Sequence, residues 1–163
     1  MDLKNKEIQD SFDFEARKHK EFFLPFYEKR GWKVLKDMVG IKNFPWDVFV
    51  ETGEFKFTID EKARKKKEFK DFLIELVQDL KNPKKSWFHE ESTNYIFYAS
   101  WLDPEKPEPS SAYLVNMRLL RTWVWKNIEV LPLRISKKGH GITLFTFTSC
   151  ENLIALRYAE KII

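Results

Sequence analysis

A chain of 163 residues with 43% hydrophobic and 16% aromatic residues is too apolar to be disordered and long enough to bury the core of one domain, residues 1–163. Its 29 basic and 25 acidic residues leave a net charge of +4, which is compatible with a nucleic-acid partner without requiring one. One cysteine excludes an internal disulfide, and three histidines without CxxC or HExxH spacing argue against a structural zinc site. The polar start and the absence of a long apolar run predict a cytoplasmic protein that is not inserted in a membrane.

The first half of the chain contains one predicted helix and three predicted strands. Apolar residues recur at helical spacing over residues 8–30, with Pro25 expected to kink or break the helix and Gly31 to end it. Residues 32–39 are predicted to form a strand. Residues 46–51 and 54–62 alternate apolar and polar side chains around Thr52-Gly53, which predicts a β-hairpin with a two-residue loop.

The second half is predicted to add four strands and two helices, with residues 69–80 as a further helix or strand. Periodicity favours a helix over 69–80, a strand over 94–102, a loop over 103–111, a strand over 112–115 and a helix over 116–127. Strands over 130–135 and 141–147 and a terminal helix over 149–162, with Ser149 as its N-cap, complete the chain. The aromatic residues of 87–101 are expected to be core rather than base-stacking groups. The sum is an α/β fold with helices around a mixed central sheet.

The charged residues at the end of the hairpin share one predicted face. Side chains alternate along a strand, so Asp60 and Lys62 point away from the apolar face. A two-residue loop places Asp47 opposite Thr58, and therefore on the face of Asp60. Diagonal neighbours lie about 7–8 Å apart, so the two carboxylates could bind one ion, whereas an odd-numbered loop would separate them.

Two carboxylates and a backbone carbonyl are the hard oxygen ligands that Mg²⁺ prefers. Such an ion lowers the pKa of a bound water and neutralises charge on a phosphodiester, and a lysine on the same face positions the water or stabilises the transition state. The same residues also fit a solvated strand edge with one surface ion pair between Asp60 and Lys62, worth at most about 1 kcal/mol. The residues alone leave both interpretations open.

An acidic residue, a hairpin and then Asp/Glu-x-Lys resembles the signature of the PD-(D/E)xK nuclease superfamily, which has the restriction-endonuclease-like fold. Here Pro45-Trp46-Asp47 is followed thirteen residues later by Asp60-Glu61-Lys62, a spacing similar to that of archaeal Holliday-junction resolvases. The helix and strand before the hairpin resemble its αβββαβ core. "TIDEKA" (58–63) resembles uncharacterised microbial and phage members, and the likeness extends over residues 12–101.

The resemblance implies a metal-dependent nuclease that hydrolyses phosphodiester bonds, with DNA as the expected partner and Mg²⁺ as the cofactor, or Mn²⁺ in its place. Asp47 and Asp60 would hold the ion, the carbonyl of Glu61 would add a ligand, and Lys62 would be the catalytic lysine. Many nucleases of this superfamily act as dimers, so a homodimer is one expected assembly.

The first helix of this superfamily often adds a glutamate to the site. Glu15 and Glu21 are candidates here, with Glu15 preferred, and a solvated helix face is the alternative for either. The narrower likeness to phage proteins makes 69–80 a strand that carries Glu75, so helix and strand both stay open for this segment. His19 is expected to lie on the surface of the first helix.

A basic run follows the predicted site. Residues 62–70 contain six basic residues and one acid, and beside a nuclease centre Arg64, Lys65, Lys66 and Lys67 would contact the phosphate backbone. A solvated surface is the alternative. Two further functions also remain open: a catalytically inactive module of the same fold that binds nucleic acid or a protein, and an unrelated α/β domain with a structural ion pair.

Overall fold

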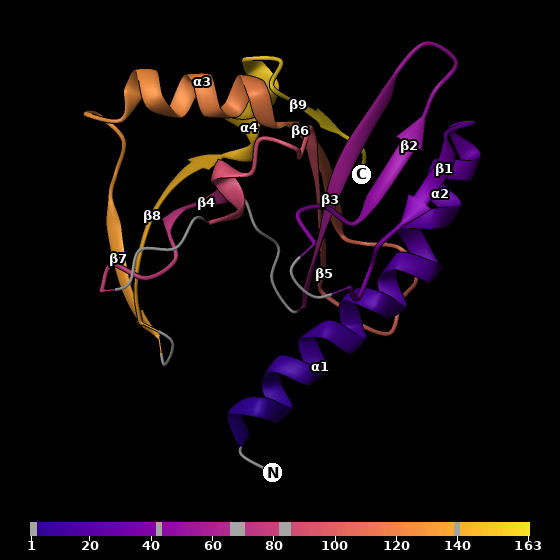
Figure 1. The fold of residues 1–163 in the computed structure, drawn as a ribbon, viewed down its shortest axis with the longest axis horizontal. Coiled ribbons are helices and arrows are strands. Elements are labelled where there is room, and N and C mark those ends of the chain that lie inside the picture. Colours follow the sequence, from indigo (N-terminus) through magenta and orange to yellow (C-terminus); the bar gives the residue numbers. More distant parts are fainter. Residues whose placement is uncertain (1–2, 42–43, 66–70, 82–85, 139–140) are drawn as a thin grey trace.

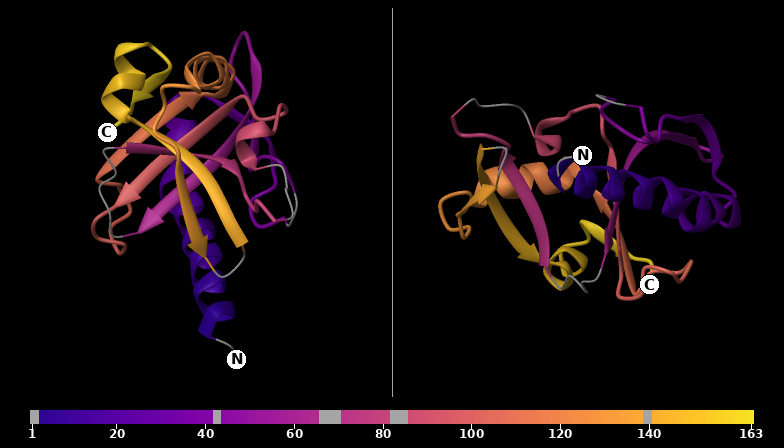
Figure 2. Two further views of the ribbon diagram at one scale, coloured as in Figure 1. Left: turned by 90° about the vertical axis from the view of Figure 1, so that its left-hand side faces the viewer. Right: turned by 90° about the horizontal axis from the view of Figure 1, so that it is seen from below.

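The computed structural model describes residues 3–41, 44–65, 71–81, 86–138 and 141–163, which form two sheets with helices packed on them (Figures 1 and 2). The elements in chain order are α1 (Leu3–Lys18), a π-helical turn η1 (His19–Phe23), α2 (Leu24–Lys29), β1 (Lys33–Asp37), β2 (Val48–Glu51), β3 (Lys56–Lys65), β4 (Asp71–Val77), a short 3-10 helix η2 (Trp87–His89), β5 (Tyr95–Trp101), β6 (Ser111–Asn116), α3 (Met117–Asn127), β7 (Arg134–Lys138), β8 (Gly141–Ser149), α4 (Cys150–Ala155) and β9 (Ala159–Lys161). The six-stranded main sheet has the order β1-β2-β3-β5-β6-β9, and the second sheet has the order β4-β8-β7. The predicted α/β class with a mixed central sheet is confirmed, because β3 and β5 are parallel and the other pairs in the main sheet are antiparallel.

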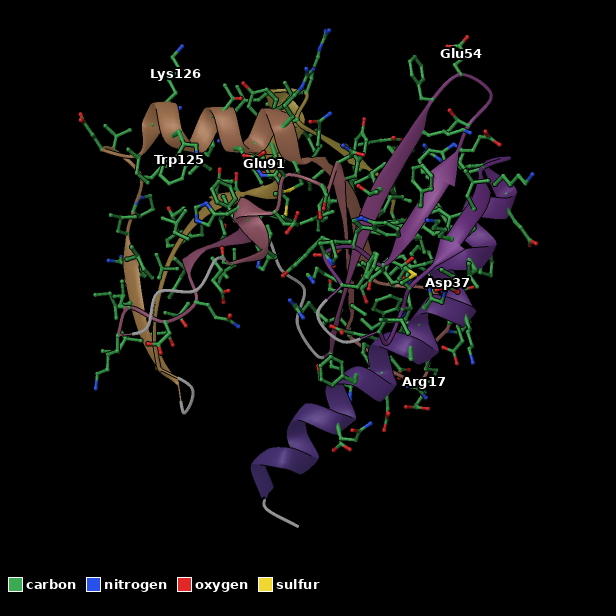
Figure 3. The ribbon with its side chains drawn as sticks, in the orientation of Figure 1. Arg17, Asp37, Glu54, Glu91, Trp125 and Lys126 are labelled. Carbon is green, nitrogen blue, oxygen red and sulfur yellow. The ribbon has the colours of Figure 1, made fainter. Side chains whose placement is uncertain are left out.

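The main sheet is covered on both faces, and side chains fill the space between the layers (Figure 3). One face packs against the N-terminal helices through a cluster that includes Phe23, Tyr27 and Trp101. The other face packs against the second sheet and α3 through a cluster that includes Phe72 and Leu120. The central strands β3 and β5 therefore run through the interior, and most aromatic residues of 87–101 are buried, as predicted. None of the described helices has both the length and the apolarity needed to cross a membrane.

The predicted N-terminal helix is confirmed, with a π turn in its middle. In the described residues it extends from Leu3 through η1 into α2, so Pro25 does not break it; the π turn directly precedes Pro25 instead. Gly31 has a φ of 70°, the left-handed conformation that ends helices. The π turn contains three buried residues, His19, Phe22 and Phe23.

The hairpin connection is longer than predicted. Glu51 pairs with Lys56 rather than with Glu54, so the connection has four residues instead of two. Thr52 closes it: its N–H donates to the carbonyl of Phe55 (2.8 Å), and the N–H of Phe55 donates to Thr52 Oγ1 (3.2 Å). Side-chain bonding by Thr52 favours this wider turn over the tight one.

With the longer connection, the side chains predicted to share one face of the sheet still do so. Four is an even number, so the same set of side chains shares a face, but the register moves by two residues. Val48 pairs with Ile59, and the next position places Asp47 beside Asp60 rather than opposite Thr58 as predicted.

The open question over residues 69–80 is decided in favour of a strand, with 71–77 forming β4 in the second sheet. Phe72, Ile74 and Leu76 alternate onto its buried face, whereas Leu73 is 42% exposed. The second helix of an αβββαβ core has no counterpart in the described part of the connection between β3 and β5, where β4 and η2 lie instead. This part of the expected core is therefore not matched.

The strands predicted over 94–102, 112–115 and 141–147 and the helix α3 are confirmed. The strand predicted over 130–135 is displaced and forms at 134–138, and the terminal helix is shorter than predicted. Ser149 caps α4 by accepting a hydrogen bond from the N–H of Asn152 (3.0 Å), as predicted. The helix ends at Ala155 because Arg157 takes a left-handed conformation with a φ of 58°. The chain then turns back, and 159–161 form β9 against β6.

Candidate functional site

The backbone of Asp47 is fixed between its two neighbouring strands. Its N–H donates to the carbonyl of Ile59 (2.9 Å), and its carbonyl accepts from the N–H of Met38 (2.7 Å). The loop before it is held by a hydrogen bond from Thr93 Oγ1 to the carbonyl of Pro45 (2.8 Å). The Asp47 side chain is therefore presented from a position that the sheet itself defines.

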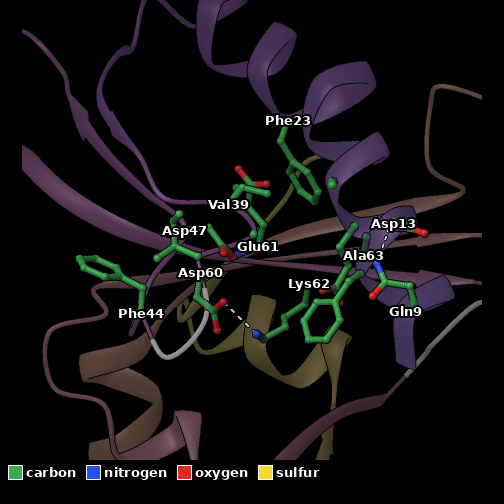
Figure 4. Close-up of a pocket in the computed structure, with 15 residues that line it drawn as sticks. Gln9, Asp13, Phe23, Val39, Phe44, Asp47, Asp60, Glu61, Lys62 and Ala63 are labelled. Carbon is green, nitrogen blue, oxygen red and sulfur yellow. Dashed lines mark hydrogen bonds and ion pairs between the residues drawn. The ribbon is translucent and has the colours of Figure 1, made fainter. Parts of the chain in front are cut away.

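Asp60 and Lys62 project from β3 next to Asp47 and face one pocket (Figure 4). Lys62 Nζ donates to Asp60 Oδ1 (2.8 Å), and the two side chains are 24% and 10% exposed. The pocket has a volume of about 560 Å³ and is also lined by Glu15 from α1. The structure thus brings together the four residues that the sequence and the resemblance singled out as catalytic.

Glu15, rather than Glu21, is the helix glutamate that lines this pocket. Burial raises the pKa of its carboxyl, against the positive charges of Lys62 and Arg64. Glu21 instead accepts a hydrogen bond from Lys18 Nζ at 2.6 Å. Glu75 lies on β4, in the second sheet, and is not one of the described residues that line the pocket.

The main chain of Glu61 contacts Asp47 at the pocket, whereas its side chain lies in the layer of N-terminal helices. Its N–H donates to Asp47 Oδ2 (2.6 Å). Carbonyls alternate in direction along a strand, and that of Ile59 points toward β2, so the carbonyl of Glu61 points to the same side as the Asp47 carboxylate. The Glu61 side chain enters the helix layer, where it accepts a hydrogen bond from the Tyr27 hydroxyl (2.9 Å).

His19 is buried, and the prediction that it lies on the surface is wrong. It is 2% exposed, with Nδ1 2.8 Å from Glu61 Oε2 and Nε2 3.0 Å from Asp37 Oδ2. Asp37, at the end of β1, lies beside the helix layer (Figure 3). His19 lies three and four residues before the buried Phe22 and Phe23, a spacing that places it on their face of the helix, and this signal could have revealed its burial.

The carboxylates of Asp47, Asp60 and Glu61 lie close enough to repel one another. Burial, followed by the negative charges of Asp60 and Glu61, raises the pKa of Asp47 to about 8, although Lys62 acts in the opposite direction. Burial also raises the pKa of Glu61, although the hydrogen bonds from His19 and Tyr27 oppose it. A cation between Asp47 and Asp60 would relieve this repulsion.

The donor set fits a hard divalent cation that keeps part of its water shell. In the described ranges no three His, Cys, Asp or Glu side chains are already grouped closely enough to hold a metal ion. Asp47 and Asp60 would thus supply two ligands and the carbonyl of Glu61 a third. Mg²⁺ is commonly held by one or two carboxylates, water and substrate phosphate, which matches such a partial set.

The described part of the basic run packs against α1. Arg64 Nη1 lies 3.4 Å from Glu15 Oε1, and Lys65 Nζ donates to the carbonyl of Asp10 (2.9 Å). Lys66 and Lys67, which were also predicted to bind nucleic acid, lie outside the described residues. Of the four residues predicted to contact the phosphate backbone, Arg64 is linked to the pocket through Glu15, which lines it.

Comparisons with known protein families, with curated proteins and with solved structures found no match. The functional assignment therefore depends on the residues of this pocket and on their chemistry.

Proposed function

We propose that this chain is a metal-dependent nuclease of the restriction-endonuclease-like type that hydrolyses phosphodiester bonds of DNA. The observation that supports this most strongly is the convergence on one pocket of Asp60 and Lys62 from β3 and of Asp47, which directly precedes the adjacent strand β2. The parallel pairing of β3 with β5 after an antiparallel hairpin is a further resemblance to that fold, while β4 departs from it.

In this proposal Asp47, Asp60 and the carbonyl of Glu61 hold Mg²⁺ or Mn²⁺. The bound ion would acidify a water and neutralise the charge that develops on the phosphate. Lys62 Nζ, now hydrogen-bonded to Asp60, would turn to the attacking water or to a phosphate oxygen. Glu15, whose pKa is raised, would accept a proton from that water.

The reaction balances with water as the only co-reactant. The water oxygen bonds to phosphorus, one bond from phosphorus to a bridging sugar oxygen breaks, and the leaving oxygen takes a proton from solvent. All residues of the proposed site come from one chain, so the chemistry needs no second copy. The net charge of +4 and the basic run next to the site would supply contacts to the phosphate backbone.

The test is cleavage of supercoiled and branched DNA with Mg²⁺ and with EDTA. Asp60→Asn and Lys62→Ala are each expected to lower the cleavage rate at least about 100-fold, because each removes a group that acts on charge in the transition state. Matched controls lie at the other end of the same hairpin, where Lys56 and Glu51 form an ion pair at 2.9 Å. Lys56→Ala and Glu51→Gln are expected to cleave at the parent's rate.

Cleavage in EDTA, or full activity in both site variants, would contradict this mechanism. If the parent cleaves nothing and binds no Mn²⁺ in calorimetry, but binds DNA in a salt-dependent way, the inactive binding module is the better assignment. If it binds neither metal nor DNA, the contact between Asp60 and Lys62 is a structural ion pair.

A further inference from the structure

A second pocket lies between the hairpin and the C-terminal segment. The β2–β3 connection, α4 and β9 gather at the same end of the main sheet (Figures 1 and 2). The pocket they border has a volume of about 490 Å³, which falls within the range of small-molecule sites. Five of its lining residues are aromatic: Trp32, Phe55, Phe57, Tyr95 and Tyr158.

Three of these rings form a wall of fixed orientation. The ring of Phe57 meets that of Trp32 edge-to-face, with centroids 5.2 Å apart, and lies 5.0 Å from that of Tyr95. Phe55, at the hairpin connection, is 67% exposed beside them. Rings held in this way offer faces and edges on which a planar aromatic ligand can stack.

Arg157 lines the same pocket from a backbone conformation that favours glycine. Its φ of 58° is the only positive value at a non-glycine residue in the described part of the chain. The position directly follows the end of α4, where glycine or asparagine is usual, and the N–H of Arg157 donates to the carbonyl of Ile154 (2.9 Å). An arginine kept where its backbone is unfavourable points to a use for its side chain.

The charge of this arginine is not neutralised within the protein. Among the described residues the Arg157 side chain has no hydrogen-bond or ion-pair partner, and its neighbour Glu160 is bonded to Arg30 (3.2 Å). Asn116, the N-cap of α3, and Leu119 of its first turn also line the pocket. The positive end of this 11-residue helix therefore adds to the attraction for an anion.

We propose that this pocket binds a nucleotide, with its base stacked on the wall of Trp32, Phe57 and Tyr95 and its phosphate paired with Arg157. Both a free nucleotide and the phosphorylated end of a nucleic-acid strand have this chemistry. The pocket is separate from the proposed nuclease centre, because Phe57 and Asp60 are three residues apart on β3, a distance of about 10 Å.

The test measures binding of adenosine monophosphate, adenosine and a 5′-phosphorylated oligodeoxyadenosine in EDTA, where the proposed nuclease is inactive. Quenching of tryptophan fluorescence and calorimetry report the affinity. We expect adenosine monophosphate to bind at least tenfold more tightly than adenosine. An oligonucleotide that binds at least tenfold more tightly than the monophosphate identifies a strand end as the ligand, and equal or weaker binding identifies the free nucleotide.

Arg157→Gly separates a binding role from a structural one. Glycine suits the left-handed backbone, so the melting temperature is expected to stay equal or rise, while the affinity for the monophosphate falls at least tenfold and that for adenosine is unchanged. Arg157→Asn, which tolerates the same backbone, should behave alike. Arg134→Ala, an exposed arginine of β7, serves as the charge control and should bind as the parent does.

Three results would overturn the proposal. The first is no binding of either phosphorylated ligand at millimolar concentration, and the second is parental affinity in Arg157→Gly. The third is concentration-dependent self-association that Phe55→Ser removes, because the exposed ring would then belong to an interface between copies of this chain. Because the measurements need no metal and no cleavage, they stand or fall independently of the nuclease.

Discussion

Replacing His19 with alanine is expected to lower the free energy of unfolding by about 3 kcal/mol or more at pH 7. The Glu61 carboxyl is 6% exposed and would keep the Tyr27 hydroxyl as its side-chain donor. Removing one partner of a buried pair leaves an uncompensated charge, which typically costs about 3–5 kcal/mol. Urea unfolding measures the change, and Lys20→Ala, at the exposed neighbouring position, should alter stability by less than about 0.5 kcal/mol.

The same histidine is expected to make stability depend on pH on the alkaline side. Burial opposes the charge on His19, but the hydrogen bonds and charges of Glu61 and Asp37 outweigh it and raise the pKa to about 9. Because this lies above the ordinary value of 6.5, the stabilisation is complete below pH 6.5 and is lost as the pH rises through 9. His19→Gln should lack this decline between pH 6.5 and 9. A parent whose stability is flat over that range, or a glutamine variant that declines equally, would contradict the assignment.

The burial of His19 matters for the site because Glu61 links His19 to Asp47. Its side chain is anchored to His19 and Tyr27 on the helix side of the main sheet, and its N–H is bonded to Asp47 at the pocket. A shift of the Glu61 peptide would therefore move the carboxylate of Asp47. The π turn takes part in this connection, because it contains His19, which contacts Glu61 of β3.

The alternation of β3 was sufficient to predict which charged residues meet. Asp60 and Lys62 share a face by strand geometry alone, and Asp47 joins them because the hairpin connection has an even number of residues. The length of that connection was not predictable from Thr52-Gly53, since the hydrogen bonds of the Thr52 side chain widen the turn. The predicted register of β2 and β3 was therefore wrong by two residues, whereas the prediction of which side chains share a face was right.

Tertiary packing decided the features that local patterns did not. In β4 the apolar residues Phe72 and Leu76 are four apart, a spacing that suits a helix, but they also fall on one face of a strand that includes Ile74. Pairing with β8 selects the strand. The left-handed turn at Arg157 has no local signature such as glycine, so the sequence suggested that the helix continues through β9.

Asp47→Asn is expected to separate metal binding from stability. Burial and the charges of Asp60 and Glu61 raise the pKa of Asp47 to about 8, so the neutral acid is favoured relative to an ordinary aspartate, and asparagine has nearly the same shape as that neutral acid. Its amide oxygen can accept the N–H of Glu61, and its uncharged side chain removes the repulsion from Asp60 and Glu61. We expect the free energy of unfolding in EDTA to stay within about 0.5 kcal/mol of the parent or to rise. The affinity for Mn²⁺, measured by calorimetry, should fall at least about 100-fold, because one of two carboxylate ligands is lost.

The pH dependence of the same pair of proteins supplies the control. An acid whose pKa is raised in the folded state binds its proton more tightly there, so the parent's stability in EDTA should fall as the pH rises from about 4 to 8, and the variant should lack that contribution. Asp71→Asn, at an exposed position on β4, should leave both the pH profile and the Mn²⁺ affinity unchanged. If Asp47→Asn binds Mn²⁺ as the parent does, the carboxylate is not a ligand. If the Asp47 charge destabilises the metal-free protein and its loss removes Mn²⁺ binding, then Asp47 is kept for binding the metal at a cost in stability.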